Sequence, residues 1–386
     1  MPENIPRILA MIDWYLPGYR AGGPIQSVNN LVQAMRNRFA IKVITTDTDH
    51  ACSDPYEGIE GDSWNQLADG TEVFYYTQQG LKLSALEDLL KQEAFDFLYL
   101  NSMYSVPFTM WPLWLCWRNR LPGKVVLAPR GMLQAGAVQI KWAKKRLYLF
   151  LMSLTGIQKR IIWHATDETE AQDIQRYFGT DCDIRLAPNL PRQDQMPWLE
   201  VPKSSGEAHF VFSSRVSRKK NIEFFLQRLH GIRGKVTFDI FGPQEDESYL
   251  DQCKEEVQKL PDTIQVRFHG ALPSSELQQK LRTYHISVLT THAENFGHAI
   301  FEGMLAGKPV LISDRTPWRG LSASKAGWDL SLSTPEAFEQ IIQEIVDMDQ
   351  PTYNIWSQSA WEYARKFRTD PELIKQVNQV FQAKKT

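Results

Sequence analysis

Cysteine is scarce in this sequence, and long apolar runs are absent from it. Only four cysteines occur among 386 residues, they lie far apart, and no two form a CxxC pair. This spacing argues against a zinc site and a disulfide framework, so we expect reduced thiols in a cytoplasmic protein. No segment approaches the roughly 18 consecutive apolar residues of a membrane-spanning helix, which predicts a soluble or peripheral protein. The first residues, MPENIPR, lack a basic stretch followed by an apolar core, so we expect no signal peptide.

Acidic residues are also absent from one long segment. The chain contains 45 aspartates and glutamates and has a net charge of only -2, yet none of these acids lies between Asp96 and Asp167. A positive segment that also contains aromatic residues can bind nucleic acid, and it can equally bind an anionic membrane surface. This acid-free segment, residues 97–166, contains ten basic residues and five tryptophans, namely Arg118, Arg120, Lys124, Arg130, Lys141, Lys144, Lys145, Arg146, Lys159 and Arg160, with Trp111, Trp114, Trp117, Trp142 and Trp163.

Strand and helix patterns alternate along the chain, which predicts an α/β fold with two open parallel sheets covered by helices on both faces. A single core stops growing at roughly 250–300 residues, so the length favours two domains. A proline-rich polar stretch at 188–206 interrupts the alternation. We therefore place the first domain at 1–195 and the second at 206–367, and we expect a C-terminal helix at about 368–386 to pack back on the first. The predicted strands are 7–12, 40–46, 95–100, 124–128, 161–165, 209–212, 236–241, 264–268, 285–291 and 308–313.

Ligands of open parallel sheets bind beyond the carboxyl ends of the strands. Three loops of unusual composition should lie there: Gly22–Gly23, Arg215–Lys220 and Glu294–Gly297. The second of these loops is strongly basic, with Arg215, Arg218, Lys219 and Lys220 in the sequence SSRVSRKKN. Such a run is often only a solvated face, but cations are disfavoured at the positive end of a helix, and a bound diphosphate would explain them better.

The third loop belongs to the segment AENFGHAIFEGMLAGKPVLISD, which carries Glu294 and Glu302 around a turn at Gly297. Either glutamate alone could be a solvated helix residue. A glycine lets the backbone approach a ligand, and the free N–H groups at a helix start can bind an oxyanion. A carboxylate can accept two hydrogen bonds from a sugar diol. Together with the basic loop, this segment predicts a site for a sugar nucleotide.

The segments SRVSRKKN and AENFGHAIFEGMLAGKPVLISD resemble the paired signatures of the retaining glycosyltransferases of family four, the large group-one glycosyl transferases. The segments YLPGYRAGGPIQSVNNLVQAM, LAPNLP and DRTPWRGL are similar to the same family, so the resemblance spans nearly the whole chain. It implies the GT-B fold, with two facing Rossmann-like domains, parallel sheets and a deep inter-domain cleft. In that family the second domain holds most of the nucleotide-sugar donor, and the first holds the acceptor.

The resemblance also implies roles for single residues. Arg215 and Lys220 would hold the donor diphosphate, and Glu294 would contact the hydroxyls of the donor sugar; we count these three as catalytic. Glu302 would take the ribose diol. The other donor-binding residues would be Gly22 and Gly23 in the first-domain loop, Gly270 and Leu272 near the base, and Asn295, Phe296 and Gly297 beside the sugar.

The sequence departs from the family in one first-domain loop. Many members carry a histidine there that faces the reaction centre, whereas LAPRGML has Arg130. Front-face retention needs little from a protein base, because the leaving phosphate can take the proton of the acceptor. We count Arg130 as a fourth catalytic residue, which would stabilise the diphosphate or grip an acidic acceptor, although it could also be a surface loop arginine. His164 and Asp13 are weaker candidates.

We expect no catalytic metal and no cofactor besides the nucleotide-sugar substrate. Three D-x-D patterns, at 47–49, 181–183 and 347–349, could suggest a metal-dependent transferase of another fold. The pattern is short enough to arise by chance, and none of the three adjoins the phosphate motifs.

The function that these observations favour is sugar transfer to a saccharide acceptor, lipid-linked, in bacterial surface polysaccharide, lipopolysaccharide or exopolysaccharide biosynthesis. Basic residues at 118–160 would seat the enzyme on the anionic inner face of the plasma membrane, and we expect no nucleic acid. The helix within 137–160 could instead pack on the sheet with its lysines in water. The alternatives are a soluble small-glycoside transferase, a sugar-nucleotide epimerase of the same fold, or a non-catalytic nucleotide-sugar or nucleic-acid binding protein.

Overall fold

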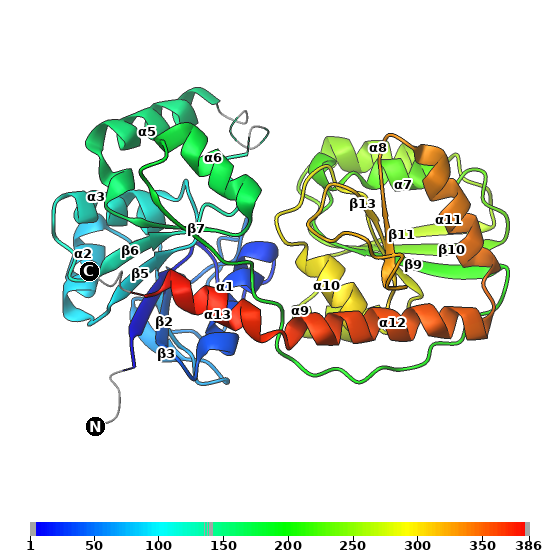
Figure 1. The fold of residues 1–386 in the computed structure, drawn as a ribbon, viewed down its shortest axis with the longest axis horizontal. Helices are drawn as coiled ribbons and strands as arrows, with labels where there is room; N and C mark the ends of the chain where they lie inside the picture. The colour runs from blue at the N-terminus through cyan, green and yellow to red at the C-terminus, as the bar shows by residue number, and fades with distance from the viewer. Residues whose placement is uncertain (1–4, 135, 137, 139–141, 383–386) are drawn as a thin grey trace. The chain divides into compact units, whose positions relative to one another are not determined.

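The chain divides into two units in the computed structural model, which describes residues 5–134, 136, 138 and 142–382. Residues 1–190 and 370–386 form the first unit, and residues 191–369 form the second (Figure 1). The proline-rich stretch lies mostly in the second unit, where the buried Lys203 donates to the carbonyls of Ser204, Val346 and Met348. In the part of the chain that the structure describes, no helix is both long and apolar enough to cross a membrane.

An eight-stranded sheet forms the centre of the first unit. Its strands are β1 (Arg7–Met11), β2 (Ala40–Thr46), β3 (Ser63–Gln66), β4 (Glu72–Tyr76), β5 (Phe97–Leu100), β6 (Lys124–Leu127), β7 (Ile162–Ala165) and β8 (Asp183–Leu186). Its helices are α1 (Gly23–Met35), α2 (Leu83–Gln92), the π-helical η1 (Val106–Met110), α3 (Trp111–Trp117), α5 (Trp142–Thr155), the 3₁₀ turn η2 (Ile157–Lys159), α6 (Glu168–Phe178) and α13 (Pro371–Val380).

The strand order of this sheet is β3-β4-β2-β1-β5-β6-β7-β8. Every neighbouring pair is parallel except β3 and β4, which are antiparallel. This pair corrects the expectation of a wholly parallel sheet. The turn between the two strands is too short for the crossover that a parallel pair requires, so the chain can only return antiparallel.

Side chains of β5 alternate between the two faces of the first sheet. Leu98 and Leu100 join a core with residues of α2, α3, α5 and α6. Phe97 and Tyr99 lie on the opposite face of the sheet. Phe381, which follows α13, packs on both of these rings. Arg185 of β8 also donates to backbone carbonyls at the end of α13, so this helix is fixed to the first sheet.

A six-stranded parallel sheet forms the centre of the second unit. Its strands are β9 (Glu207–Ser213), β10 (Lys235–Phe241), β11 (Ile264–Gly270), β12 (Ile286–Leu289), β13 (Val310–Ser313) and β14 (Gly327–Leu330). Its helices are the 3₁₀ turn η3 (Arg218–Lys220), α7 (Ile222–Arg228), α8 (Glu247–Val257), α9 (Ser274–Leu281), α10 (His298–Leu305), α11 (Pro335–Asp347) and α12 (Gln350–Arg368). Figure 1 shows α7 and α8 on one face of this sheet and α9, α10 and α12 on the other.

Each sheet contains a point where the strand order reverses, and ligands of such sheets bind in the crevice at that point. The reversal lies between β1 and β5 in the first sheet and between β9 and β12 in the second. The basic loop at 214–220 follows β9, and the loop that contains Glu294 follows β12. Because β9 and β12 are parallel neighbours, both loops leave the same edge of the sheet at its reversal point.

Candidate functional site

Lys220 and Glu294 form an ion pair, although 74 positions separate them in the sequence. Their side chains are only 12% and 15% exposed. Burial by itself raises the pKa of Glu294, but the charges of Lys220, Lys219 and His298 outweigh burial and hold that pKa below its usual value. Glu294 is therefore a buried carboxylate that stays ionised beside a lysine. The two loops thus place one charge of each sign at the reversal point of the second sheet.

Hydrogen bonds between the two loops hold Lys220 in position. The hydroxyl of Thr291 donates to the carbonyl of Lys219 at 3.0 Å, and the hydroxyl of Thr290 donates to the carbonyl of Asn221 at 2.8 Å. Both accepting residues are direct neighbours of Lys220, so its backbone is fixed on either side. Asn221 has a positive φ of 56°, which turns the chain from the basic loop into α7.

The two arginines of the basic loop have different surroundings. Arg218 is held by α8, because its guanidinium donates to Ser248 and Gln252 at 3.0 and 2.9 Å and lies over the ring of Tyr249. Arg215 is exposed, and among the described residues nothing hydrogen-bonds its guanidinium. Arg215 is therefore the arginine of this loop whose charge remains available to a ligand.

Gly297 forms the turn that begins α10. Its φ is 80°, and a Cβ at this position would lie 2.7 Å from a carbon of Ile300 and 3.2 Å from a carbon of Glu294. Phe296 is buried, and its carbonyl accepts a hydrogen bond from the indole of Trp318. Asn295 is half-buried between Glu294 and this anchored phenylalanine. Core packing therefore fixes the turn, and only glycine fits it without strain.

Glu302 lies inside α10 and is only 7% exposed. Among the described residues, no hydrogen bond or ion pair reaches its carboxylate. Burial raises the pKa of Glu302 to about 7; the charge of Arg192 lowers this pKa and the charge of Asp194 raises it. Arg192 itself pairs with Asp194 and donates to the hydroxyl of Ser274, at the start of α9, at 2.8 Å. The structure thus brings Arg192 into the neighbourhood of Glu302.

Gly270 is the last residue of β11, and Leu272 follows it at the same edge of the sheet. Gly270 has a φ of 76°, and its carbonyl accepts a hydrogen bond from the amide of Gly242 at 2.7 Å. Gly242 has no side chain to separate it from Ser214, at the start of the basic loop, and a Cβ there would clash with the carbonyl of Ser214. Leu272 packs against a small apolar cluster that includes Tyr284. The loops after β9, β10 and β11 are therefore in close backbone contact.

Gly22 and Gly23 lie at the start of α1 in the first unit. Gly22 is the N-terminal cap with a φ of 65°, and Gly23 is the first residue of the helix. The preceding loop is held by Asp49, whose carboxylate accepts hydrogen bonds from the amides of Tyr19 and Arg20 at 2.8 and 3.1 Å. This loop follows β1, one of the two strands at the reversal point of the first sheet.

Arg130 is half-buried and has a φ of 56°. Its guanidinium donates from Nε to Asn101 at 2.7 Å and from its two Nη atoms to Tyr99 and Asn189. A guanidinium has five N–H donors, so two remain for other partners. Arg130 is therefore held by three side chains at the carboxyl edge of the first sheet. The alternative expectation, a free arginine in a surface loop, does not describe it.

The two weaker candidates are also held internally. His164 Nε2 faces the carbonyl of Ala187 at 2.8 Å, so this nitrogen carries the proton and Nδ1 accepts from the hydroxyl of Tyr99 at 3.0 Å. Burial lowers the pKa of His164 to about 3, so its imidazole is neutral. Asp13 accepts a hydrogen bond from Ser105 at 2.6 Å, and burial raises its pKa in spite of this bond. Neither side chain lacks a protein partner.

No group of three or more metal-ligating side chains that could hold an ion occurs among residues 5–134, 136, 138 and 142–382. At least one acid of each D-x-D pattern has a partner in the protein. Asp49 caps a backbone turn, Asp183 pairs with Arg185 at 3.0 Å, and Asp349 caps the start of α12.

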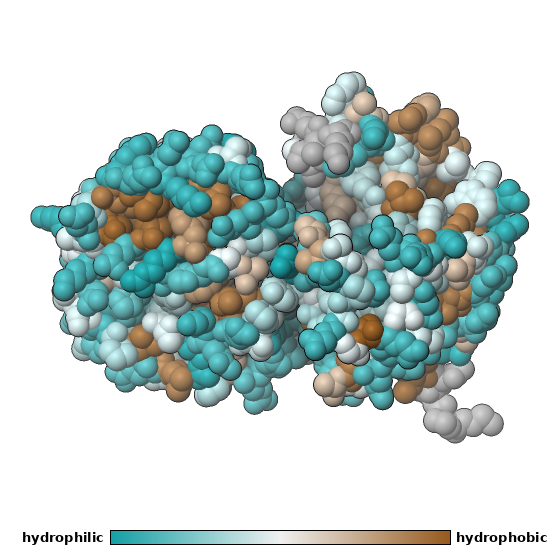
Figure 2. All heavy atoms as spheres, turned by 180° about the vertical axis from the view of Figure 1, so that it is seen from behind, coloured by the Kyte–Doolittle hydropathy of each residue, from teal (hydrophilic) through white to brown (hydrophobic). Residues whose placement is uncertain are grey.

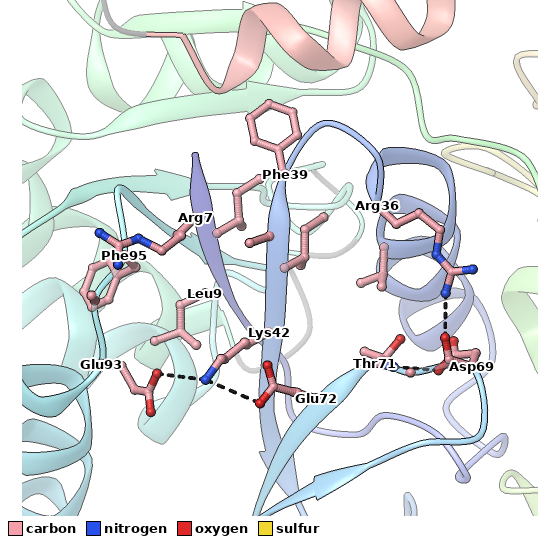
Figure 3. A pocket seen from close by; sticks show the side chains of 16 residues that line it. Arg7, Leu9, Arg36, Phe39, Lys42, Asp69, Thr71, Glu72, Glu93 and Phe95 are labelled. Atoms are coloured by element: carbon pink, nitrogen blue, oxygen red, sulfur yellow. Dashed lines mark hydrogen bonds and ion pairs between the residues drawn. The ribbon is translucent and has the colours of Figure 1, made fainter. Parts of the chain in front are cut away.

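A cavity of about 250 Å³ lies at the amino ends of β1 and β2, the edge of the first sheet opposite the candidate residues (Figure 3). Several of its charged side chains already have protein partners. Lys42 pairs with Glu72 and Glu93 at 3.6 and 3.2 Å, and Arg36 donates to the carbonyl of Asp69 at 2.7 Å. Because these cations are already bonded within the protein, we assign no ligand to this cavity.

Sequence comparison relates the second unit to known glycosyltransferases. Residues 199–363 match the family model described as Glycosyl transferases group 1, and this segment contains Arg215, Lys220, Glu294 and Glu302. The chain is also similar to the probable glycosyltransferase WbjE of Pseudomonas aeruginosa, with 26% identity over 177 residues. That alignment covers 44% of this chain and 42% of WbjE, which is less than half of the relative's length. The family match supports a group 1 glycosyltransferase.

Two solved structures show where the fold belongs. Anabaena Alr3699/HepE, in complex with UDP and glucose, superimposes with a TM-score of 0.68 at 15% identity, covering 97% of this chain and 98% of that one. WaaG, a glycosyltransferase involved in lipopolysaccharide biosynthesis, superimposes with a TM-score of 0.65 at 12% identity and the same coverage. Identities this low inform on the fold alone. They confirm the expected α/β fold of the GT-B type with two Rossmann-like domains, and the inter-domain cleft stays a prediction.

Proposed function

We propose that this chain is a retaining, metal-independent glycosyltransferase of family four that moves a sugar from a nucleotide-sugar donor to a saccharide acceptor. The observation that carries the proposal is the buried pair of Lys220 and Glu294 at the reversal point of the second sheet, inside the segment that matches the group 1 model. The complex of HepE with UDP and glucose, a protein of the same fold, is further support for a nucleotide-sugar donor.

In the proposed mechanism the second unit holds the donor. Lys220 and Arg215 neutralise the diphosphate while the bond between the anomeric carbon and the phosphate oxygen breaks. The acceptor hydroxyl attacks that carbon from the same face, and its proton passes to the leaving phosphate oxygen. Glu294 orients the donor sugar through its hydroxyls, together with the turn formed by Asn295, Phe296 and Gly297. The protein therefore contributes positioning and charge stabilisation.

The remaining donor contacts follow from the same proposal. Glu302 accepts hydrogen bonds from the ribose diol, which would give this buried carboxylate the partners that it lacks among the described residues. Gly270 and Leu272 lie near the base. Gly22 and Gly23 belong to the first-unit loop that covers the diphosphate and sugar.

We propose further that the acceptor is lipid-linked and that the enzyme acts as a cytoplasmic, peripheral protein on the inner face of the plasma membrane. The support is the acid-free segment, in which residues 118–160 present exposed cations that include Arg118, Lys144, Arg146 and Arg160. WaaG, which shares the fold, is involved in lipopolysaccharide biosynthesis. The proposed setting is bacterial surface polysaccharide, lipopolysaccharide or exopolysaccharide assembly, and no nucleic acid takes part.

A donor screen tests this function. We expect the purified chain to hydrolyse one class among UDP-, GDP-, ADP- and TDP-sugars slowly, and to transfer that sugar with retention of its anomeric configuration, as read by NMR. Activity should survive excess chelator, because the cations of Arg215 and Lys220 take the place of a metal. Failure to turn over any donor would contradict the proposal, and loss of activity restored by manganese would refute its metal independence.

Arg130→Ala is expected to lower the turnover number for transfer by roughly 10-fold or more, because hydrogen bonds to charged groups typically contribute about 1.5–3 kcal/mol. The donor KM should change less than the turnover number, because the charge that Arg130 would stabilise develops in the transition state. Arg120→Ala is the matched control: Arg120 lies in the same unit but is exposed and pairs with Glu87. Equal turnover in both variants would remove Arg130 from the catalytic residues.

A further inference from the structure

Helix α5 is apolar on two opposite faces. Leu149 and Met152 are each only 4% exposed and belong to the core of the first unit. The opposite face carries four exposed side chains: Leu147 at 59%, Phe150 at 59%, Leu151 at 50% and Leu154 at 67%. Their spacing of three, four and seven residues aligns them in one stripe along the helix, which we call the α5 stripe.

The α5 stripe is the centre of a larger exposed apolar surface. Figure 2 shows hydrophobic side chains gathered on the unit that contains α5. Trp142 of α5 is 59% exposed, and Trp114 and Trp117 of α3 are 40% and 43% exposed. The turn η2, which follows α5, brings the two helices into one surface, since Arg160 donates to the carbonyl of Trp117 at 3.2 Å. Scattered exposed apolar residues are ordinary, but a concentration of this kind marks an interaction surface.

Cations border the α5 stripe on both sides. A helix advances about 100° per residue, so Lys144 lies to one side of the stripe and Arg146 lies to the other. Both side chains are exposed. Lys145 lies on the buried side, over the ring of Tyr104, and we do not count it. Lys141, which belonged to the predicted basic face, lies outside the described residues.

We infer that α5 is an interfacial membrane anchor whose apolar stripe enters an anionic lipid leaflet. In this arrangement the helix lies in the plane of the interface, Lys144 and Arg146 contact the lipid phosphates, and the tryptophans lie at the depth of the headgroups. This inference rests on the proposed function, in which the acceptor is linked to a membrane lipid. It adds that apolar side chains of α5, and not charge alone, hold the enzyme on the membrane.

Charge complementarity favours a lipid leaflet over other occupants. A second copy of this chain, seated on the stripe by two-fold symmetry, would bring the same cations together, and the acid-free segment has no acid to offset them. Nucleic acid would pair with Lys144 and Arg146, but its phosphates would not cover four apolar side chains. An anionic leaflet satisfies both the cations and the stripe.

The test is sedimentation of the full chain with vesicles of phosphatidylcholine, alone or mixed with phosphatidylglycerol, at low and high salt. We expect binding to the mixed vesicles that weakens with salt but persists, since salt screens charges and does not screen apolar insertion. A variant with Leu147→Ser, Phe150→Ser, Leu151→Ser and Leu154→Ser should bind at least ~100-fold more weakly at both salt concentrations. Lys144→Glu with Arg146→Glu should weaken binding mainly at low salt.

A matched control changes exposed apolar residues of the second unit. Leu199→Ser with Ile355→Ser removes side chains that are 48% and 51% exposed and should leave vesicle binding unchanged. Wild-type binding by the four-serine variant would overturn the inference. Two other results would also overturn it. One is a wild-type protein that does not bind vesicles and is a dimer, while the four-serine variant is a monomer. The other is binding to a DNA oligonucleotide without binding to vesicles.

The same variants separate this inference from the proposed function. All substituted side chains are exposed, so we expect the four-serine variant to fold and to hydrolyse the donor in solution at the wild-type rate. Transfer to a lipid-linked acceptor in vesicles should fall with vesicle binding. Vesicle binding by a protein that uses no nucleotide sugar would support the membrane anchor and contradict the proposed function. Sugar transfer without vesicle binding would support the proposed function and contradict the anchor.

Discussion

Lys220→Ala is expected to lower the turnover number for sugar transfer by roughly 10- to 150-fold, the range that corresponds to losing one hydrogen bond to a charged group. The lysine stabilises charge that develops on the leaving diphosphate, so its removal should act on turnover more than on the donor KM. The pKa of Glu294 should rise in this variant, because burial raises that pKa and the charge of Lys220 no longer offsets burial. Initial rates over a range of donor concentrations measure both constants.

The buried position of the pair makes a folding control necessary. Removing one partner of a buried ion pair typically destabilises a protein by about 3–5 kcal/mol, so a loss of activity could reflect unfolding. Arg218→Ala provides the comparison, because Arg218 lies in the same turn but is held by α8. We expect near wild-type turnover for Arg218→Ala and unchanged circular dichroism for both variants at assay temperature. Wild-type turnover in Lys220→Ala would remove the lysine from the mechanism.

The strands that the sequence predicted are short segments rich in apolar and β-branched residues. The segment at 40–46 corresponds to β2, and the segment at 236–241 lies within β10. Both strands have a neighbour on either side, so most of their apolar side chains are covered. Strands β3, β4, β8 and β14 were missed. β4 has the sequence EVFYY, so an apolar run was overlooked there. β3 is an edge strand with the sequence SWNQ, and β8 is an edge strand with the sequence DIRL, so neither forms an apolar run. Pairing with a neighbour, which the sequence does not display, defines both.

The sequence predicted which residues belong to the candidate site, but it did not predict the contacts that they make with each other. Lys220 and Glu294 were expected to bind different parts of one ligand, and the structure shows that they also bind each other. Arg192 was missed because it lies in a proline-rich stretch without periodicity, and only the folded chain brings it near Glu302. The roles of these residues toward a donor stay predictions.

Helix α5 shows a different limit of sequence reasoning. Its apolar positions could be read from the sequence, but apolar residues occur on two opposite faces, so periodicity could not decide which face is buried. In the structure, Leu147 and Leu154 of one apolar face are exposed. Leu149 and Met152 fill the core in their place.

Glu302→Gln is expected to make the protein more stable and a poorer enzyme. Burial raises the pKa of Glu302 to about 7 from a usual value of 4.5. For a carboxyl whose pKa is higher in the folded state, stability is fully present below the unfolded pKa of about 4.5 and is lost as the pH rises from there through about 7. At pH 8 the ionised carboxylate should therefore cost about 3 kcal/mol, which glutamine avoids. Urea unfolding should show a much larger gain for the variant at pH 8 than at pH 5.

The same substitution should raise the donor KM by roughly 10-fold or more at pH 8, because an amide offers the ribose diol one acceptor oxygen without a charge. In the wild type, the donor KM should rise as the pH falls through about 7 and Glu302 becomes protonated, and this dependence should be absent from the variant. Glu276→Gln, at an exposed position in α9, is the control and should change neither quantity. A donor KM in Glu302→Gln equal to that of the wild type at pH 8 would refute the ribose contact, and equal stability at pH 5 and pH 8 would refute the raised pKa. A buried carboxylate that binds a ligand should show both effects. Its charge destabilises the unliganded protein, and hydrogen bonds from the bound donor offset that destabilisation.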